Sequence, residues 1–260
     1  MTRAEDRTAV LGPVRLDHVV LGVRDLQRAT AALIAAGLPH AGGGQHTGRG
    51  TANSLFPLAE GYLELLTVTD AALARAHSPN RAQVAAALAT REVIPLGYAF
   101  QVRDVSTAAA TLRSAGQRVE GPVGMSRRNP DGQELTWRNL YLGASQWRTL
   151  LPFLITWDTP HQISSRDAPR LRGLELAAPI QPATSPSGGG QQAGHAYHLL
   201  GAADTGPGRF HLAGIDLQVS GTAAAEGITA IHVEGGAPQH PIGAGLDAYL
   251  TWTKPALHPH

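Results

Sequence analysis

Residues 23–37 read VRDLQRATAALIAAG, and residues 102–116 read VRDVSTAAATLRSAG. Aligned without gaps, the two stretches are identical at eight of fifteen positions, and they begin 79 residues apart. An internal repeat of this length indicates that a structural unit has been duplicated within the chain.

Each copy of the repeat predicts a helix with defined ends. Asp25 and Asp104 stand where a carboxylate accepts the free backbone amides of a first helical turn. The alanine-rich segments that follow carry apolar residues at helical spacing. Gly37 and Gly116 stand just past the last turn, where a helix often ends in a residue with positive φ.

Apolar segments that read as strands flank each predicted helix. They cover 16–23, 52–59 and 61–68 in the first copy and 95–102, 133–144 and 151–157 in the second. We therefore expect a first βαβββ module over residues 14–69 and a second over 93–160. Residues 70–92 predict a helical linker between them, with helix starts at Asp70 and at Ser78-Pro79.

Residues 170–252 predict a weaker third copy. The segment 171–179 resembles a first strand, 195–203 a short helix, and 209–220 and 228–236 the strands of a hairpin. Residues 180–192 predict a loop, because they are rich in Gly, Ser and Pro. The predicted fold class is α+β, with tandem βαβββ modules and a truncated third βαββ-like unit at the C-terminus.

Composition excludes several classes of function. The formal net charge is only +1, so no basic field would attract nucleic acid or an anionic membrane. The chain has no cysteine, which excludes disulfides, thiolate nucleophiles and iron–sulfur clusters. The sequence shows neither a signal-peptide pattern nor an apolar stretch as long as a membrane helix. We expect a cytoplasmic protein with a small-molecule partner, without nucleic acid or membrane partners.

The segments LDHVVLGVRDL (16–26), GGGQHTGRGTANSLFPLAEGYLELLTV (42–68) and RRNPDGQELTWR (127–138), with LPFLITWD (151–158), resemble the vicinal oxygen chelate superfamily. That superfamily includes glyoxalases, extradiol dioxygenases and bleomycin-resistance proteins. The resemblance implies paired modules around a small-molecule cavity. It does not specify the reaction, because this fold carries several unrelated chemistries.

The resemblance also implies a metal site, to which each module contributes ligands from its first and last strands. The matching positions in the first module are His18 and Glu64, which would bind a divalent ion such as Zn, Fe, Mn or Ni. In the second module, Gly97 aligns with His18, and the strand 151–157 has neither His nor Glu. The cofactor is therefore one divalent metal ion or none.

Alternative interpretations of these two residues remain open. His18 is also consistent with a hydrogen-bonded core histidine, and Glu64 with an ion pair to Arg49 or Arg138. An ionised carboxylate inside an apolar strand needs a cation or hydrogen-bond donors, because desolvation is costly.

Further polar and aromatic residues are candidates for binding substrate. The glycine-rich segment 42–53, expected to be a loop, allows close approach of a ligand to the backbone. Trp137 and Arg138 are adjacent on a strand and so would face opposite sides. The candidate substrate-binding residues are His46, Arg49, Asn53, Arg128, Trp137, Arg138, Trp157 and His161.

Three functional hypotheses follow. The first is a glyoxalase-like lyase, isomerase or dioxygenase that acts on a small oxygenated or carbonyl compound. In this enzyme His18 and Glu64 would bind metal, or would form an acid–base pair without it. The second is a non-catalytic binding protein of the bleomycin-resistance type, and the third is a purely structural paralogue. A monomer and a homodimer are both consistent with two modules in one chain.

Overall fold

The computed structural model describes residues 11–129, 131–143, 147, 149–161, 163–179, 189–222, 226–236, 238 and 241–253. The first repeat forms β1 (Arg15–Val23), α1 (Leu26–Ala35), β2 (Gly43–His46), β3 (Thr51–Pro57) and β4 (Tyr62–Val68). The second forms β5 (Val93–Gln101), α4 (Val105–Ser114), β6 (Val119–Arg128), β7 (Glu134–Leu142) and β8 (Phe153–Trp157). The helices α2 (Ala71–His77) and α3 (Pro79–Thr90) lie between the two repeats in the sequence.

The helix ends of the repeat are those that the sequence predicts. The side chain of Asp25 accepts a hydrogen bond from the backbone N–H of Arg28, and that of Asp104 accepts from Ser106 and Thr107. Gly37 follows the end of α1 with φ +90°. Because a side chain rarely adopts that φ, glycine is favoured at this position.

The two βαβββ modules close into one eight-stranded barrel with the order β1-β4-β3-β2-β6-β7-β8-β5. The strand β1 is antiparallel to β5, with His18 opposite Ala99 and Val20 opposite Gly97. His18 and Gly97, like Val20 and Ala99, are 79 residues apart. The repeat read from the sequence is therefore an internal two-fold symmetry whose axis passes between these two strands.

The segment 42–53 is not the loop that we expected, because most of it forms β2 and the start of β3. A Cβ on Gly43 would lie 2.0 Å from the carbonyl oxygen of Asn53, and one on Gly44 would lie 2.2 Å from that of Arg128. These glycines therefore permit close packing of strands. The consequence for the site is that His46 and Asn53 lie on the paired strands β2 and β3.

The C-terminal third holds six strands, whereas the expected βαββ unit has three. Its elements are β9 (Arg170–Pro179), α5 (Gly189–Leu199), β10 (Ala203–Gly206), β11 (Arg209–Leu212), β12 (Ile215–Thr222), β13 (Gly227–Glu234), the 3₁₀ helix η1 (Leu246–Ala248) and β14 (Leu250–Thr253). The sheet order is β10-β11-β12-β9-β13-β14. In this sheet β10, β11, β12 and β9 lie in the same order as β2, β3, β4 and β1 in the barrel. This unit is therefore also βαβββ.

The expected hairpin between 209–220 and 228–236 is wrong, and the pairing explains why. Residues 209–220 themselves turn back as β11 and β12, with Ala213 at φ 51° in the turn. The strand β13 pairs with β9 instead of β12, as β5 pairs with β1 in the barrel. Of the expected loop 180–192, residues 189–192 begin α5, and residues 180–188 lie outside the described residues.

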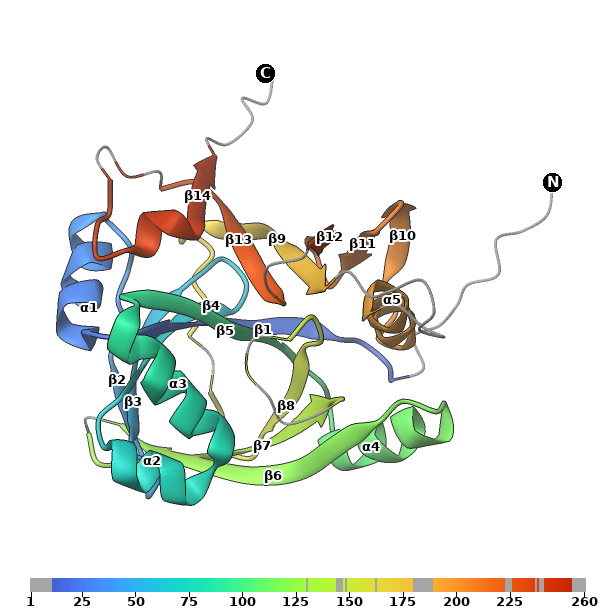
Figure 1. The fold of residues 1–260 in the computed structure, drawn as a ribbon, viewed down its shortest axis with the longest axis horizontal. Coiled ribbons are helices and arrows are strands. Elements are labelled where there is room, and N and C mark those ends of the chain that lie inside the picture. Colours follow the sequence, from blue (N-terminus) through green and yellow to red (C-terminus); the bar gives the residue numbers. More distant parts are fainter. Residues whose placement is uncertain are drawn as a thin grey trace.

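The C-terminal sheet packs on one side of the barrel, as Figure 1 shows for the orange and red strands above the blue and green ones. One continuous apolar core joins the outer face of the barrel to this sheet. Within it, the hydroxyl groups of Tyr98 and Tyr197 are 2.8 Å apart and lie 2.6 and 2.7 Å from the carbonyl oxygen of Leu150. The interior of the barrel is therefore separate from the core between the barrel and the C-terminal sheet.

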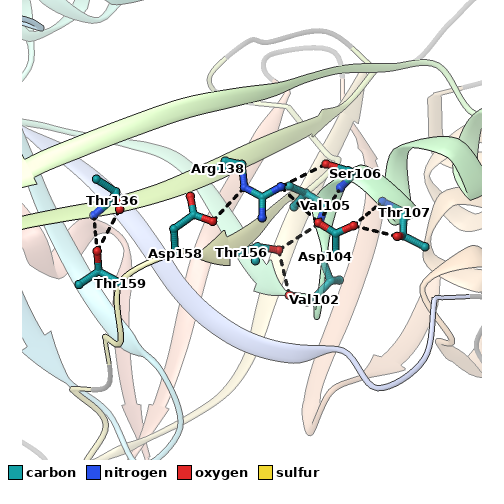
Figure 2. Close-up of polar contacts among 10 residues, drawn as sticks. All are labelled: Val102, Asp104, Val105, Ser106, Thr107, Thr136, Arg138, Thr156, Asp158 and Thr159. Atoms are coloured by element: carbon teal, nitrogen blue, oxygen red, sulfur yellow. Dashed lines mark hydrogen bonds and ion pairs between the residues drawn. The ribbon is translucent and has the colours of Figure 1, made fainter.

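A polar network fixes α4 against the outside of the barrel (Figure 2). Arg138 donates to Asp104 at 3.2 Å and to Asp158 at 3.0 Å. Thr156 accepts from the backbone N–H of Val105 and donates to the carbonyl of Val102. The N–H of Thr107, together with its hydroxyl, lowers the pKa of Asp104 to about 2.

We predict that Asp104→Ala lowers the melting temperature by a few degrees, because both the helix cap and the partner of Arg138 are lost. Asp104→Asn keeps a capping oxygen and should lose less. Since the folded pKa of Asp104 is depressed, its contribution is present above the ordinary carboxyl pKa and is lost as the pH falls through about 2. Thermal unfolding followed by circular dichroism at neutral pH checks the prediction, and an unchanged melting temperature in Asp104→Ala would contradict it.

Candidate functional site

The barrel interior contains a cavity of about 40 Å³, and most of the candidate catalytic and binding side chains line it. That volume accommodates a few water-sized groups. Aromatic rings form much of the wall, with Trp137 and Trp157 at a centroid distance of 4.9 Å and Tyr141 and Phe153 at 5.7 Å. Polar side chains project between these rings from β1, β2, β3, β4, β6 and β7. A mostly apolar cavity with a few placed polar groups is typical of a small-molecule site.

His18 and Glu64 meet in this cavity. The Nε2 of His18 lies 3.4 Å from Oε2 of Glu64, and the two side chains come from the adjacent parallel strands β1 and β4. Both are almost fully buried, at 5% and 7% exposure. An imidazole and a carboxylate removed from water at this distance are suited to exchange protons with a common substrate.

Asp17 orients His18 from the opposite side of the ring. The Nδ1 of His18 lies 2.5 Å from Oδ1 of Asp17, while Oδ2 of Asp17 accepts from Nε1 of Trp157 at 2.9 Å. Tyr62 stacks on the His18 ring at 4.8 Å. With Nδ1 bonded to a carboxylate, Nε2 is the nitrogen left to face the cavity.

Glu64 is held by an amide and an arginine. Asn53 donates to Oε1 of Glu64 at 2.8 Å, and Arg127 donates to Oδ1 of Asn53 at 3.1 Å. Arg127 thus stabilises the buried Glu64 carboxylate indirectly, through Asn53. Neither Arg49 nor Arg138 pairs with Glu64. His46 completes the group, with Nδ1 2.9 Å from Oγ1 of Thr51 and Nε2 4.0 Å from Oε1 of Glu64.

The two histidines of the cavity have opposite pKa shifts. Burial lowers the pKa of His18, but its hydrogen bond to Asp17 and the negative charges of Asp17 and Glu64 outweigh burial, so the net pKa is raised. Burial, aided by the charges of Arg81 and Arg127, lowers the pKa of His46 to about 3. The raised pKa favours the protonated form of His18, whereas His46 is neutral at neutral pH.

The structure places some of the candidate substrate-binding residues in the cavity and others outside it. His46, Asn53, Trp137 and Trp157 line the cavity. Arg138 lies on the outside of the barrel, between Asp104 and Asp158 (Figure 2). Trp137 and Arg138 thus face opposite sides of the barrel wall, as strand alternation predicts.

The other three candidates lie around the barrel. Arg49 reaches His77 and the carbonyl oxygen of Gly124. Arg128 is exposed and donates to the carbonyl of Gly132 at 3.2 Å. The ring of His161 packs at a tilt against that of Trp157, with a centroid distance of 4.0 Å, and His161 lines a separate cavity of about 550 Å³.

Sequence reasoning missed the cavity residues Arg81, Arg127 and Asn139, and also Asp17 behind His18. Adjacent residues of a regular strand face opposite sides, so Asp17 and His18 were not expected to touch. A bulge between Leu16 and His18 in the pairing of β1 with β5 breaks that alternation. No sequence signal available for a single chain marks this bulge.

The donors in the cavity do not fit the metal centre that the family resemblance implies. In the second module Gly97 takes the position of His18 and Phe153 that of Glu64. Within the described part of the chain, no group of three or more His, Asp or Glu side chains is placed to hold a metal ion. Arg127 also brings a permanent positive charge close to Glu64 through Asn53.

The described residues include no helix that is both long and apolar enough to cross a membrane.

Comparison with known proteins agrees with this architecture. A family model described as "Glyoxalase-like domain" matches residues 16–188. A hypothetical protein from Staphylococcus aureus superposes with a TM-score of 0.68 at 14% identity, covering 93% of this chain and 99% of that one. A triple mutant of 4-hydroxymandelate synthase from Streptomyces coelicolor superposes with a TM-score of 0.57 at 12% identity, covering 86% and 71%. No curated protein matches the sequence. At these identities the structural likeness shows the fold alone.

Proposed function

Since the chain belongs to the glyoxalase-like domain family, a branch of the vicinal oxygen chelate superfamily, we propose that it is an enzyme that moves a proton on a small oxygenated carbonyl compound. The observation that carries the proposal is the 3.4 Å approach of His18 Nε2 to Glu64 Oε2 inside a buried, largely aromatic cavity. Lyase and isomerase reactions at a carbon beside a carbonyl both begin with such a proton transfer.

The two groups take complementary roles. Glu64 removes a proton from the carbon next to the carbonyl, so a C–H bond breaks and an O–H bond forms on the carboxylate. His18, protonated and held by Asp17, donates a hydrogen bond or its proton to the carbonyl oxygen as negative charge develops there. Return of a proton to carbon completes an isomerisation. Asn53 and Arg127 keep the Glu64 carboxylate in position throughout.

A second function is favoured by one observation. The positions equivalent to His18 and Glu64 in the second module are Gly97 and Phe153. The second module therefore has a small residue and an aromatic residue where the first has an imidazole and a carboxylate. A protein that only binds and sequesters a small molecule would need no acid–base pair. In that case the aromatic walls of the cavity would carry the function.

Exchange of carbon-bound hydrogen for solvent deuterium separates these two functions. Untagged protein is incubated in D₂O with small 2-hydroxy- and 2-oxo-carbonyl compounds, and deuterium at the carbon beside the carbonyl is followed by NMR. We expect protein-dependent exchange, with no stoichiometric metal in the same sample by elemental analysis. Saturable binding without exchange would support the sequestering function. About one metal ion per chain that is lost in both His18→Ala and Glu64→Ala would show that the pair acts as a metal site instead.

A further inference from the structure

Two buried polar atoms in the wall of the barrel cavity have no partner. Among the described residues, the buried side-chain polar atoms without a hydrogen bond are Arg81 Nη1, Asn139 Oδ1, His161 Nε2 and Trp252 Nε1. The first two belong to residues that line the cavity. A buried donor or acceptor left unpaired is costly because it has lost its hydrogen bonds to water. Two such atoms in the wall of one cavity therefore indicate a ligand that pairs with both.

The charges that face the cavity favour an anion. Its wall carries two guanidinium groups, Arg81 and Arg127, against a single carboxylate, Glu64. Arg127 is engaged with Asn53, whereas Arg81 forms no hydrogen bond or ion pair with any described residue. Burial and the neighbouring Arg49 lower the pKa of Arg81 to about 10, so Arg81 still carries its charge at neutral pH.

The position of Arg81 links the cavity to solvent. Arg81, Tyr141 and Trp147 line both the barrel cavity and an outer pocket of about 170 Å³. Arg49 and His77 also border that outer pocket. A negative ligand would therefore meet a cationic mouth before it reaches His18 and Glu64, and such a mouth raises the local concentration of anions.

We propose that the cavity binds a small carboxylate that also bears a hydroxyl group, with the carboxylate on Arg81 and the hydroxyl hydrogen donated to Oδ1 of Asn139. Arginine suits this role because its planar fork matches the two oxygens of a carboxylate. Asn139 is the counterpart of Asn53 in the barrel symmetry, since each lies on the third strand of its module, opposite Ile155 and Leu66 respectively. Asn53 is satisfied by Glu64 and Arg127. The amide nitrogen of Asn139 donates to the hydroxyl of Tyr141 at 3.4 Å, which leaves Oδ1 of Asn139 as the unpaired amide oxygen.

This inference names the substrate class for the proposed function, and it is tested by binding alone. Lactate carries both groups, propanoate only the carboxylate and propane-1,2-diol only hydroxyls. Because Trp137, Trp147 and Trp157 line the cavity, titration followed by tryptophan fluorescence reports binding directly. We expect lactate to bind about tenfold more tightly than propanoate, as one hydrogen bond to a buried acceptor implies. The diol should give no saturable change.

Variants assign these preferences to the two residues. Arg81→Gln should weaken lactate binding by about tenfold or more, and Arg81→Lys should restore part of it. Asn139→Leu should remove the preference for lactate over propanoate. Arg118→Gln is the matched control, since Arg118 is exposed and pairs with Glu120. Unchanged lactate affinity in Arg81→Gln, or a diol that binds as tightly as lactate, would overturn the inference.

The same titration keeps this inference separate from the proposed catalysis. His18→Gln should keep the preference for lactate over propanoate, because neither unpaired atom belongs to His18. Binding that depends on Arg81, in a protein that exchanges no carbon-bound hydrogen, would support the carboxylate site and sink the proposed reaction. Exchange of carbon-bound hydrogen that is unaffected by Arg81→Gln would support the proposed reaction and contradict the carboxylate site.

Discussion

Glu64→Gln is expected to reduce deuterium exchange by about 10²- to 10⁴-fold, the usual contribution of a positioned general base. The amide has the shape of the carboxylate but cannot accept a proton from carbon. One oxygen remains to accept from Asn53, so the hydrogen bond of 2.8 Å to Asn53 can persist. The loss should therefore appear in kcat, with little change in the affinity for lactate.

Stability separates this interpretation from a structural role of Glu64. If the main role of Glu64 were to balance the charge of Arg127 in the fold, Glu64→Gln would leave Arg127 uncompensated and make the protein clearly less stable. We expect instead a melting temperature within a few degrees of the unsubstituted value. Glu92→Gln is the control, since Glu92 is exposed and pairs with Arg28, and it should retain full exchange. Full activity in Glu64→Gln would remove Glu64 from the mechanism.

The two tandem modules could be predicted from the sequence because their determinants are local. Asp25, Asp104, Gly37 and Gly116 define two helices by capping and by positive φ, and each acts within a few residues of the chain. Their repetition 79 residues apart then implies two equal modules. The third module was harder to recognise, because Ala213 at φ 51° makes a tight turn without a typical turn sequence at that position.

The candidate site was predictable only in part. His18 and Glu64 could be chosen because they match the ligand positions that the family resemblance implies, and Glu64 also because a carboxylate is unusual in an apolar strand. His46 and Asn53 could be chosen because they lie in the glycine-rich segment 42–53. Arg127 was missed in favour of Arg128. The strand β6 was not predicted, and without it nothing indicates which of two adjacent arginines faces inward.

The unpaired atoms of Arg81 and Asn139 were beyond sequence reasoning for a different reason. Being unpaired is a property of the folded surroundings, since it requires that every neighbouring donor and acceptor be engaged elsewhere. Arg81 lies in α3, outside both modules. Only the packed structure brings that helix to the mouth of the barrel.

Asp17→Asn is expected to lower kcat by about 10²-fold or more, although Asp17 does not line the cavity. The carboxylate of Asp17 holds Nδ1 of His18, and an amide nitrogen turned toward that position would favour the tautomer with its proton on Nε2. Asp17 therefore acts as a positioning residue. A purely structural role would lower stability without changing the pH dependence of the reaction.

The pH profile is the decisive measurement for this variant. The general-acid form of His18 exists below its pKa, so activity should fall as the pH rises through that value. In the unsubstituted protein burial lowers this pKa, but the bond to Asp17 and the charges of Asp17 and Glu64 raise it by more. Asp17→Asn removes the two contributions of Asp17 and leaves burial and Arg127 opposed only by Glu64. The alkaline limb of the kcat profile should therefore move to lower pH, whereas Asp25→Asn, which keeps its helix cap, should leave the limb in place. A reduced kcat with an unmoved limb would mean that Asp17 supports the fold of β1 and does not set the protonation of His18.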